Sequence, residues 1–179
     1  YGAIVEYVIR SRGGYSEGRL KEELSAIRQA GQHVIEAVKG VKHLRKNLLK
    51  SLQSDNPTIR KEYDRLRKLI LKMMRDIEIV RTTGTGSASV LSLDRLKLDI
   101  EEKTRQFSEG LDMLIRNEQI NVYAATSLMN DISYCRDICW DLVEAGSVLF
   151  SESHPDERDA MRSIALGEHE ILEMITDTN

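Results

Sequence analysis

Apolar side chains recur along most of this chain in steps of three and four residues, which is the repeat of an amphipathic helix. The longest such segment covers residues 20–52, and its apolar positions are Leu20, Leu24, Ile27, Gly31, Val34, Val38, Val41, Leu44, Leu48 and Leu52. The motif "SDNPT" ends it, because Asn56 can cap a new helix and Pro57 suits a first helical turn. We therefore predict a long helix up to about residue 52 and a second helix from Pro57.

The segments that follow show the same repeat. The second predicted helix carries its apolar stripe at Ile59, Tyr63, Leu66, Ile70, Met73, Ile77 and Val80, and the linker "TTGTGSAS" follows it. A third spans about 89–116, a fourth runs to about residue 150, and "SESHPDE" predicts the start of a fifth. With short connections throughout, the sequence predicts an all-α fold, an antiparallel bundle of four to five long helices.

The first residues read differently from the rest. "AIVEYVIR" is apolar, "SRGGYSEG" interrupts it, and the sequence starts at Tyr1 without an initiator Met. We expect residues 1–13 to be the end of a preceding helix, residues 14–179 to form the bundle domain, and the whole to be a piece of a longer protein. No apolar run approaches the roughly 20 residues that cross a bilayer, and no signal peptide is recognisable.

Charge is distributed unevenly along the chain. The net charge is only −3, but residues 39–81 hold 13 Lys/Arg against 5 Asp/Glu, and residues 112–179 hold 4 against 14. Within the basic part, one helix face carries four lysines over an arc of about 80°: Lys39, Lys42, Lys46 and Lys50. The stripe lies opposite the predicted core, so it is either a solvated face or a surface for anionic lipid or another acidic partner.

The neighbouring helix continues this basic character with Lys61, Arg65, Lys68 and Lys72. Adjacent basic stripes on two antiparallel helices would form a patch that attracts anionic headgroups. Nucleic acid is not the expected partner, because no recognition motif is present and no aromatic residues are interleaved for stacking on bases.

The helix that ends near residue 150 holds the most informative polar residues. Asp131 falls in the middle of its apolar seam, where an unpaired carboxylate would be costly, so it belongs either to a buried polar network or to a metal site. Asp137 and Asp141 follow at DxxxD spacing, which stacks two oxygen ligands on one face but is also common on solvated helices. A divalent or iron-type metal held by Asp131, Asp137 and Asp141 is therefore one hypothesis.

The remaining chemistry gives no sign of an enzyme. Cys135 and Cys139 are four residues apart in the seam, which favours core packing over a redox or zinc site. No ExxH di-iron motif, phosphate loop or assembled triad is recognisable. Trp140 lies opposite the seam, so we expect a fifth helix or a second subunit to cover it.

Several stretches resemble a known family. These are "GGYSEGRLKEEL", "AVKGVKHLRKNLLKSLQSDNPTIRKEYDRLRKLI", "SVLSLDRLKLDI" and "ATSLMNDISYCRDICWDLVEAGSVLF". Over about residues 14–150 they are similar to the PhoU-like cytoplasmic tail of bacterial Na⁺/phosphate cotransporter-family proteins.

The resemblance implies a helical, non-enzymatic regulatory or interaction domain in phosphate uptake. It would lie at the cytoplasmic face of the inner membrane, with the transporter's membrane domain in the same chain as its partner and a homodimer as a further possibility. PhoU-type proteins also bind metal clusters through E/DxxxD motifs, of which Asp137 and Asp141 match the spacing here. A metal-binding helical protein and a structural dimerisation bundle are the alternatives.

Overall fold

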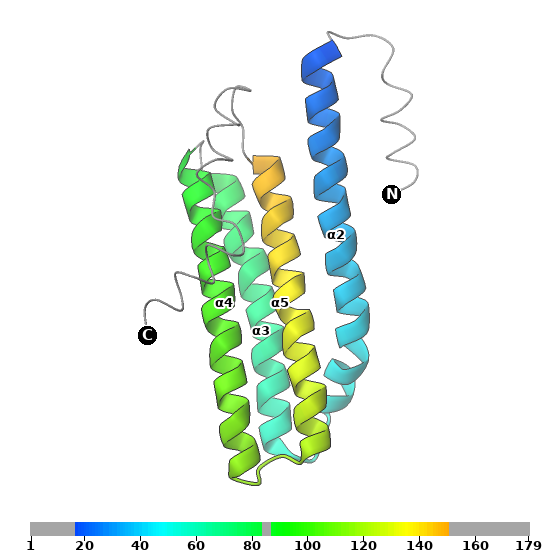
Figure 1. Ribbon diagram of the computed structural model, residues 1–179, viewed down its shortest axis with the longest axis vertical. Coiled ribbons are helices and arrows are strands. Elements are labelled where there is room, and N and C mark those ends of the chain that lie inside the picture. The colour runs from blue at the N-terminus through cyan, green and yellow to red at the C-terminus, as the bar shows by residue number, and fades with distance from the viewer. Residues whose placement is uncertain (1–16, 84–86, 151–179) are drawn as a thin grey trace.

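The protein is an all-α bundle of four long helices, with no strand in the part of the chain that is described. The computed structural model describes residues 17–83 and 87–150, with side chains described within 23–83 and 91–150. The helices are α2 (Glu17–Leu52), α3 (Pro57–Thr83), α4 (Ser87–Arg116) and α5 (Val122–Phe150). Figure 1 shows them running up and down side by side, with α2 at one edge and α4 at the other. The predicted segments 1–13 and 151–179 lie outside the described residues.

The turn between α2 and α3 forms as the sequence predicts. The side-chain oxygen of Asn56 accepts hydrogen bonds from the backbone nitrogens of Thr58, at 2.9 Å, and Ile59, at 3.3 Å, and Pro57 is the first residue of α3. Asn56 also donates through Nδ2 to the backbone oxygen of Gln119, at 2.8 Å. This contact ties the α2–α3 turn to the α4–α5 turn at the same end of the bundle, the lower end in Figure 1.

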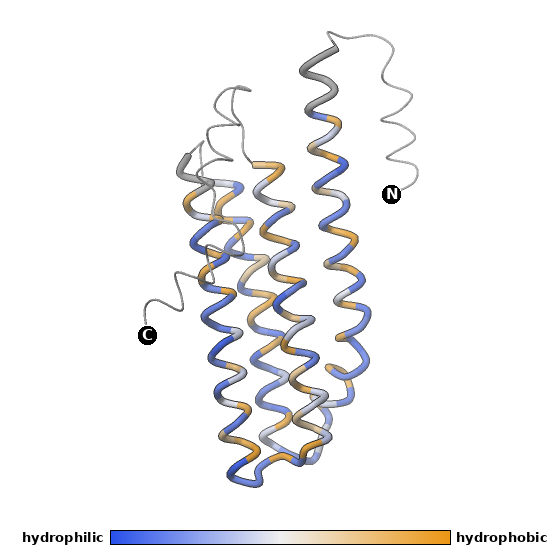
Figure 2. Tube along the Cα trace, viewed as in Figure 1, coloured by the Kyte–Doolittle hydropathy of each residue, from blue (hydrophilic) through white to orange (hydrophobic). Residues whose placement is uncertain are grey.

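Helix α5 is the centre of the bundle, because it packs on α2, α3 and α4. Figure 2 shows apolar and polar residues alternating along each helix. The apolar stripe predicted for α3 is confirmed as core, with Ile59, Tyr63, Leu66, Met73 and Val80 buried, and α4 buries a stripe with the same repeat, formed by Leu93, Leu96, Ile100, Phe107 and Leu111. They pack with Leu128, Ile132, Cys135 and Cys139 of α5 in one hydrophobic cluster.

The core face predicted for α2 is correct near its C-terminus and wrong over much of its length. Leu44 is buried, but Ile27, Val34, Val38 and Val41 are 45%, 44%, 62% and 44% exposed. The buried positions are instead small: Ala26, Ala30 and Ala37. The reason is that α2 lies at the edge of the bundle and packs mainly on α5, which buries only a narrow seam.

Close approach of α2 and α5 explains why that seam is made of small residues. A Cβ atom placed on Gly40 would lie 2.7 Å from Cγ1 of Ile138 and 3.8 Å from the backbone oxygen of Tyr134. A glycine here therefore lets the two backbones come together, at some cost in helix propensity. Gly110 of α4 differs, because a Cβ atom there would meet nothing within 4 Å.

These two glycines give a matched test of the α2–α5 contact. We expect Gly110→Ala to raise the free energy of unfolding by up to about 1 kcal/mol through helix propensity. Gly40→Ala should fail to give this gain, and Gly40→Val should destabilise by about 1–3 kcal/mol, because either side chain must displace Ile138. Urea unfolding followed by circular dichroism measures both. Equal stabilisation by the two Gly→Ala changes would contradict the close contact.

Candidate functional site

A buried polar cluster joins three helices around Asp131 of α5. Asp131 is 0% exposed. Tyr63 of α3 donates through its hydroxyl to Oδ2 of Asp131, at 2.5 Å, and Asn47 of α2 donates through Nδ2 to Oδ1, at 3.2 Å. Asn47 also reaches the hydroxyl oxygen of Ser127, at 3.4 Å. The inward placement of Asp131 is confirmed, and its surroundings are those of a buried polar network.

Burial controls the protonation of this cluster. It raises the pKa of the Asp131 carboxyl above its usual range, while the hydrogen bonds from Tyr63 and Asn47 work in the opposite direction. Burial, together with the hydrogen bond to Asp131, also raises the pKa of Tyr63 to about 12. The tyrosine therefore keeps its proton at neutral pH and acts as a donor to the carboxyl group.

The other two carboxylates of the predicted metal site have different surroundings. Oδ1 of Asp141 lies 3.0 Å from Nδ1 of His33, which forms a second polar contact between α5 and α2. Asp137 is exposed and contacts only its neighbour Arg136, at 3.3 Å, among the interactions described for it. No group of three or more His, Cys, Asp or Glu residues within 17–83 and 87–150 is arranged to hold a metal ion. Asp131, Asp137 and Asp141 are thus not brought together.

A charged layer between α4 and α5 was not predicted from the sequence. Lys97 is buried, and its Nζ lies 2.9 Å from Oε1 of Glu144 and 3.5 Å from Oδ1 of Asp94. One turn away, Nε of Arg136 lies 2.7 Å from Oε1 of Glu101. The spacing of Asp94, Lys97 and Glu101 places these charged residues beside the apolar stripe of α4, which is visible in the sequence. The sequence does not show which residues of α5 they contact.

Trp140 lies within this charged layer. Nζ of Lys97 is 5.8 Å and Cζ of Arg136 is 5.4 Å from the centre of its ring, so two cations approach the indole. Trp140 is half-buried. The fifth helix that we expected to cover it lies outside the described residues, and its cover by a second subunit stays a prediction.

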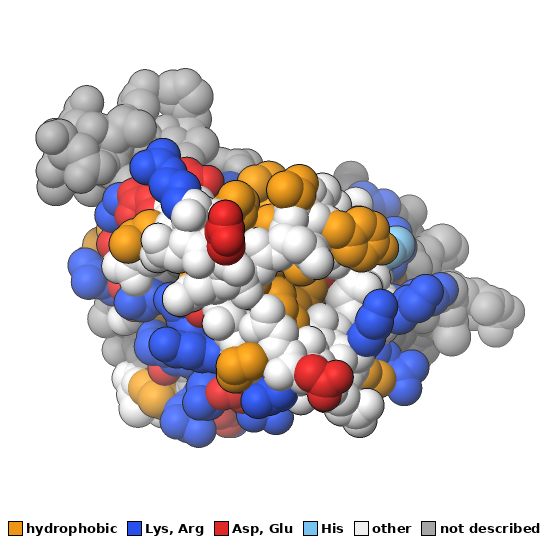
Figure 3. All heavy atoms as spheres, turned by 90° about the horizontal axis from the view of Figure 1, so that it is seen from below, with side chains coloured by type: hydrophobic (Ala, Val, Ile, Leu, Met, Phe, Trp, Pro, Cys, Tyr) orange, Lys and Arg blue, Asp and Glu red, His pale blue; other side chains and the backbone are white. Residues whose placement is uncertain are grey.

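The predicted lysine stripe lies on the outer surface of α2. Lys39, Lys42, Lys46 and Lys50 are all exposed. Lys39 bonds Oε1 of Glu36 at 2.7 Å. The end-on view in Figure 3 shows Lys and Arg side chains gathered on two sides of the lower end of the bundle.

The expected continuation of this stripe onto α3 is only partial. The guanidinium carbon of Arg65 lies 4.4 Å from the ring centre of Phe107 on α4, and Nζ of Lys72 lies 3.7 Å from Asp99 on α4. Helix α4 is at the other edge of the bundle from α2 (Figure 1). These two cations therefore belong to the α3–α4 side, away from the lysine stripe.

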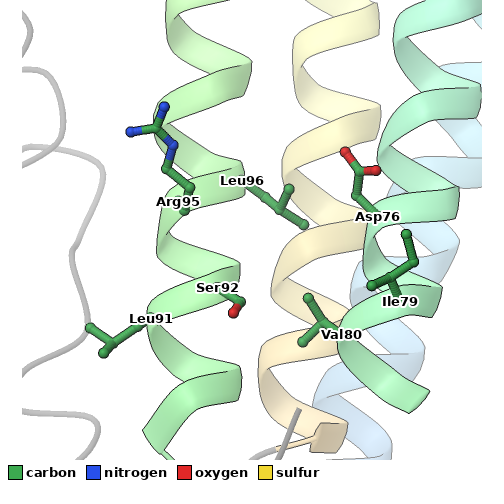
Figure 4. A pocket seen from close by; sticks show the side chains of 7 residues that line it. All are labelled: Asp76, Ile79, Val80, Leu91, Ser92, Arg95 and Leu96. Carbon is green, nitrogen blue, oxygen red and sulfur yellow. The ribbon is translucent and has the colours of Figure 1, made fainter. Parts of the chain in front are cut away.

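An open cleft of about 380 Å³ lies between α3 and α4, at the end where α3 stops (Figure 4). Its walls are mainly apolar, with Ile79, Val80, Leu91 and Leu96, and its rim carries Asp76 and Arg95. Asp76 is already bonded to Lys72, at 2.5 Å. The cleft therefore lacks the converging polar groups that orient a small ligand.

The two cysteines belong to the core, as predicted. Both are free and buried, and Sγ of Cys135 lies 3.6 Å from the backbone oxygen of Leu66. A hydrogen bond with Cys135, together with burial, raises the pKa of the Cys139 thiol. A thiol held in this way is a poor nucleophile.

The buried cluster makes a prediction for stability. Asp131→Leu leaves the hydroxyl of Tyr63 without its acceptor and Asn47 with only its long bond to Ser127, so we expect a loss of about 2–4 kcal/mol in the free energy of unfolding. The double variant Asp131→Leu/Tyr63→Phe should lose less than the sum of the single changes, because the two residues share one hydrogen bond. Urea titrations supply the values. The matched control is Asn130→Leu, at the exposed neighbouring position, which should change stability by less than about 0.5 kcal/mol.

The raised pKa of Asp131 makes a prediction for pH. A carboxyl group with a higher pKa in the folded state binds its proton more tightly when folded, so its contribution to stability is greatest in acid. Wild type should therefore lose stability relative to Asp131→Asn as pH rises above the ordinary carboxyl value of 3.8, until the folded-state pKa is passed. Unfolding of both proteins at a series of pH values measures the difference. If the wild type instead became more stable relative to Asp131→Asn over this pH range, the raised pKa of Asp131 would be wrong.

Comparisons with known proteins add no family to this description. The chain matches no protein-family model, no curated protein and no solved structure. None of the described helices combines the length and the apolar character that crossing a membrane requires. The description therefore rests on the structure itself: the described residues form an all-α bundle of four long helices around a buried carboxylate.

Proposed function

We propose that this chain is a non-enzymatic regulatory or interaction domain of a sodium-coupled phosphate transporter. In this role it would lie at the cytoplasmic face of the inner membrane and contact the transporter's membrane domain or the lipid around it. The support is the resemblance of residues 14–150 to PhoU-like tails, together with the helical bundle that such a tail would form.

The main support for a role of the protein surface is that buried polar groups have hydrogen-bond partners, whereas most of the exposed lysines on α2 have no described acidic partner. The interior ones are occupied, since no buried side-chain nitrogen or oxygen in the described residues lacks a hydrogen-bond partner. The exterior of α2 presents four exposed lysines on one face, and Lys39 alone of these has a described acidic partner. A one-sided row of cations suits a broad anionic surface better than a small ligand, because such a row encloses nothing.

Lysine reversal tests this proposal. Each basic side chain near an anionic membrane contributes about 1 kcal/mol, so loss of two should weaken vesicle binding at least about 30-fold. We expect Lys42→Glu/Lys46→Glu to stop co-sedimentation with anionic vesicles at low salt. Binding by wild type should weaken toward 0.15 M salt, where the Debye length is about 8 Å.

The control removes the same charge elsewhere. Lys103→Glu/Arg116→Glu changes two exposed cations on α4, at the other edge of the bundle, and both double variants take the net charge from −3 to −7, since each exchange subtracts two. The control should still bind. Wild type that does not sediment with anionic vesicles, or two variants that lose binding equally, would contradict a role for the stripe.

The link to transport needs its own measurement. Sodium-dependent phosphate uptake in cells that carry the complete gene should change with Lys42→Glu/Lys46→Glu and stay unchanged with the control. If phosphate uptake were unchanged in both double variants, the proposed link between the lysine stripe and transport would be wrong.

A further inference from the structure

Helix α2 carries an exposed apolar stripe that no other described element covers. Its members are the four side chains that sequence periodicity assigned to the core: Ile27, Val34, Val38 and Val41. They fall within about 60° of one another around the helix, beside the seam that packs on α5. Isolated exposed apolar residues are ordinary, but a continuous row over four turns of one helix indicates a contact surface.

The order of residues along this face is symmetric. Glu23, Ile27, Val34, Val41 and Arg45 follow one another at intervals of 4, 7, 7 and 4 residues. With 100° per residue, all five share the same face. The positions of the apolar residues in this row are therefore the same from either end of the helix. The two ends differ in charge, with an acid at one end and a base at the other.

We propose that this stripe binds a second copy of the chain, with the two α2 helices antiparallel and a twofold axis at Val34. In that register Ile27 of one copy lies against Val41 of the other, and Glu23 lies beside Arg45. A twofold interface must be complementary to itself, and a stripe with opposite charges at its two ends meets that condition only in the antiparallel direction. Steps of seven residues are those of helices that pack side by side.

The same arrangement accommodates the most exposed member of the stripe. Val38 is 62% exposed. In the antiparallel register it lies level with Ala30 of the other copy and next to Gly31, the one position of the predicted apolar repeat without a side chain. A larger residue paired with a smaller one across two helices allows them to interdigitate. The inference does not depend on the proposed role in phosphate transport.

Sedimentation equilibrium over a range of concentrations tests the association. We expect the mass to rise with concentration from 20.4 kDa to twice that value. Val38→Glu should weaken the dimer at least about tenfold without unfolding the protein, because the side chain is exposed. Val122→Glu makes the same change at an exposed position of α5 and should leave the mass unaltered.

Cysteine cross-linking tests the register. The native cysteines, Cys135 and Cys139, are buried, so added surface cysteines report alone. Under mild oxidation Val34→Cys should form a covalent dimer with itself, while Ile27→Cys should do so only when mixed with Val41→Cys. Self-linking of Ile27→Cys would indicate parallel helices and overturn the register.

The remaining results also decide the matter. A monomer at every concentration would mean that another segment of the chain, lipid or a different protein covers the stripe, and the proposal would be wrong. A dimer that tolerates Val38→Glu would place the interface elsewhere and overturn it as well.

Discussion

One buried carboxylate sets the alignment of three helices. Asp131 has no contact with water, and its two oxygens are satisfied by Tyr63 of α3 and Asn47 of α2. Sliding either helix by one turn, about 5.4 Å, would break its hydrogen bond and leave a polar group alone in the interior. Apolar seams tolerate such a slip much better, because one aliphatic side chain can replace another. The cluster therefore selects one register among several that hydrophobic packing alone would allow.

The edge position of α2 follows from the way it is attached. Asn47 bonds Asp131 and Ser127 of α5, His33 bonds Asp141 of α5, and small residues fill the rest of the seam. Alanines and Gly40 bring the backbones close, so the valines next to the seam point past α5 rather than into it. The same close contact that fixes α2 thus leaves its apolar stripe uncovered by the described helices.

The sequence predicts α3, α4 and the cap at Asn56 well, because on these helices one apolar stripe faces one core. It fails on α2, where an alanine seam and a valine stripe run side by side with the same repeat. Hydrophobicity ranks valine above alanine, whereas the distance between helices decides which of the two is buried. The inward position of Asp131 was predictable from spacing. The partners Tyr63 and Asn47 of Asp131 and the partner Glu144 of Lys97 were not predictable, since they come from other helices.

The two surfaces of α2 are compatible with each other. At 100° per residue, the lysines centre about 120° from the valine stripe, on the side away from α5. The twofold axis that relates two antiparallel helices is perpendicular to the plane that contains them. Equivalent residues of the two copies therefore lie on the same side of that plane. In the proposed pair, both rows of lysines would therefore point away from both bundles. Two weak rows on one broad face bind a membrane far more tightly than either alone, because the second contact forms within an attached molecule. A cationic row too weak to hold one copy at physiological salt would then suffice for two.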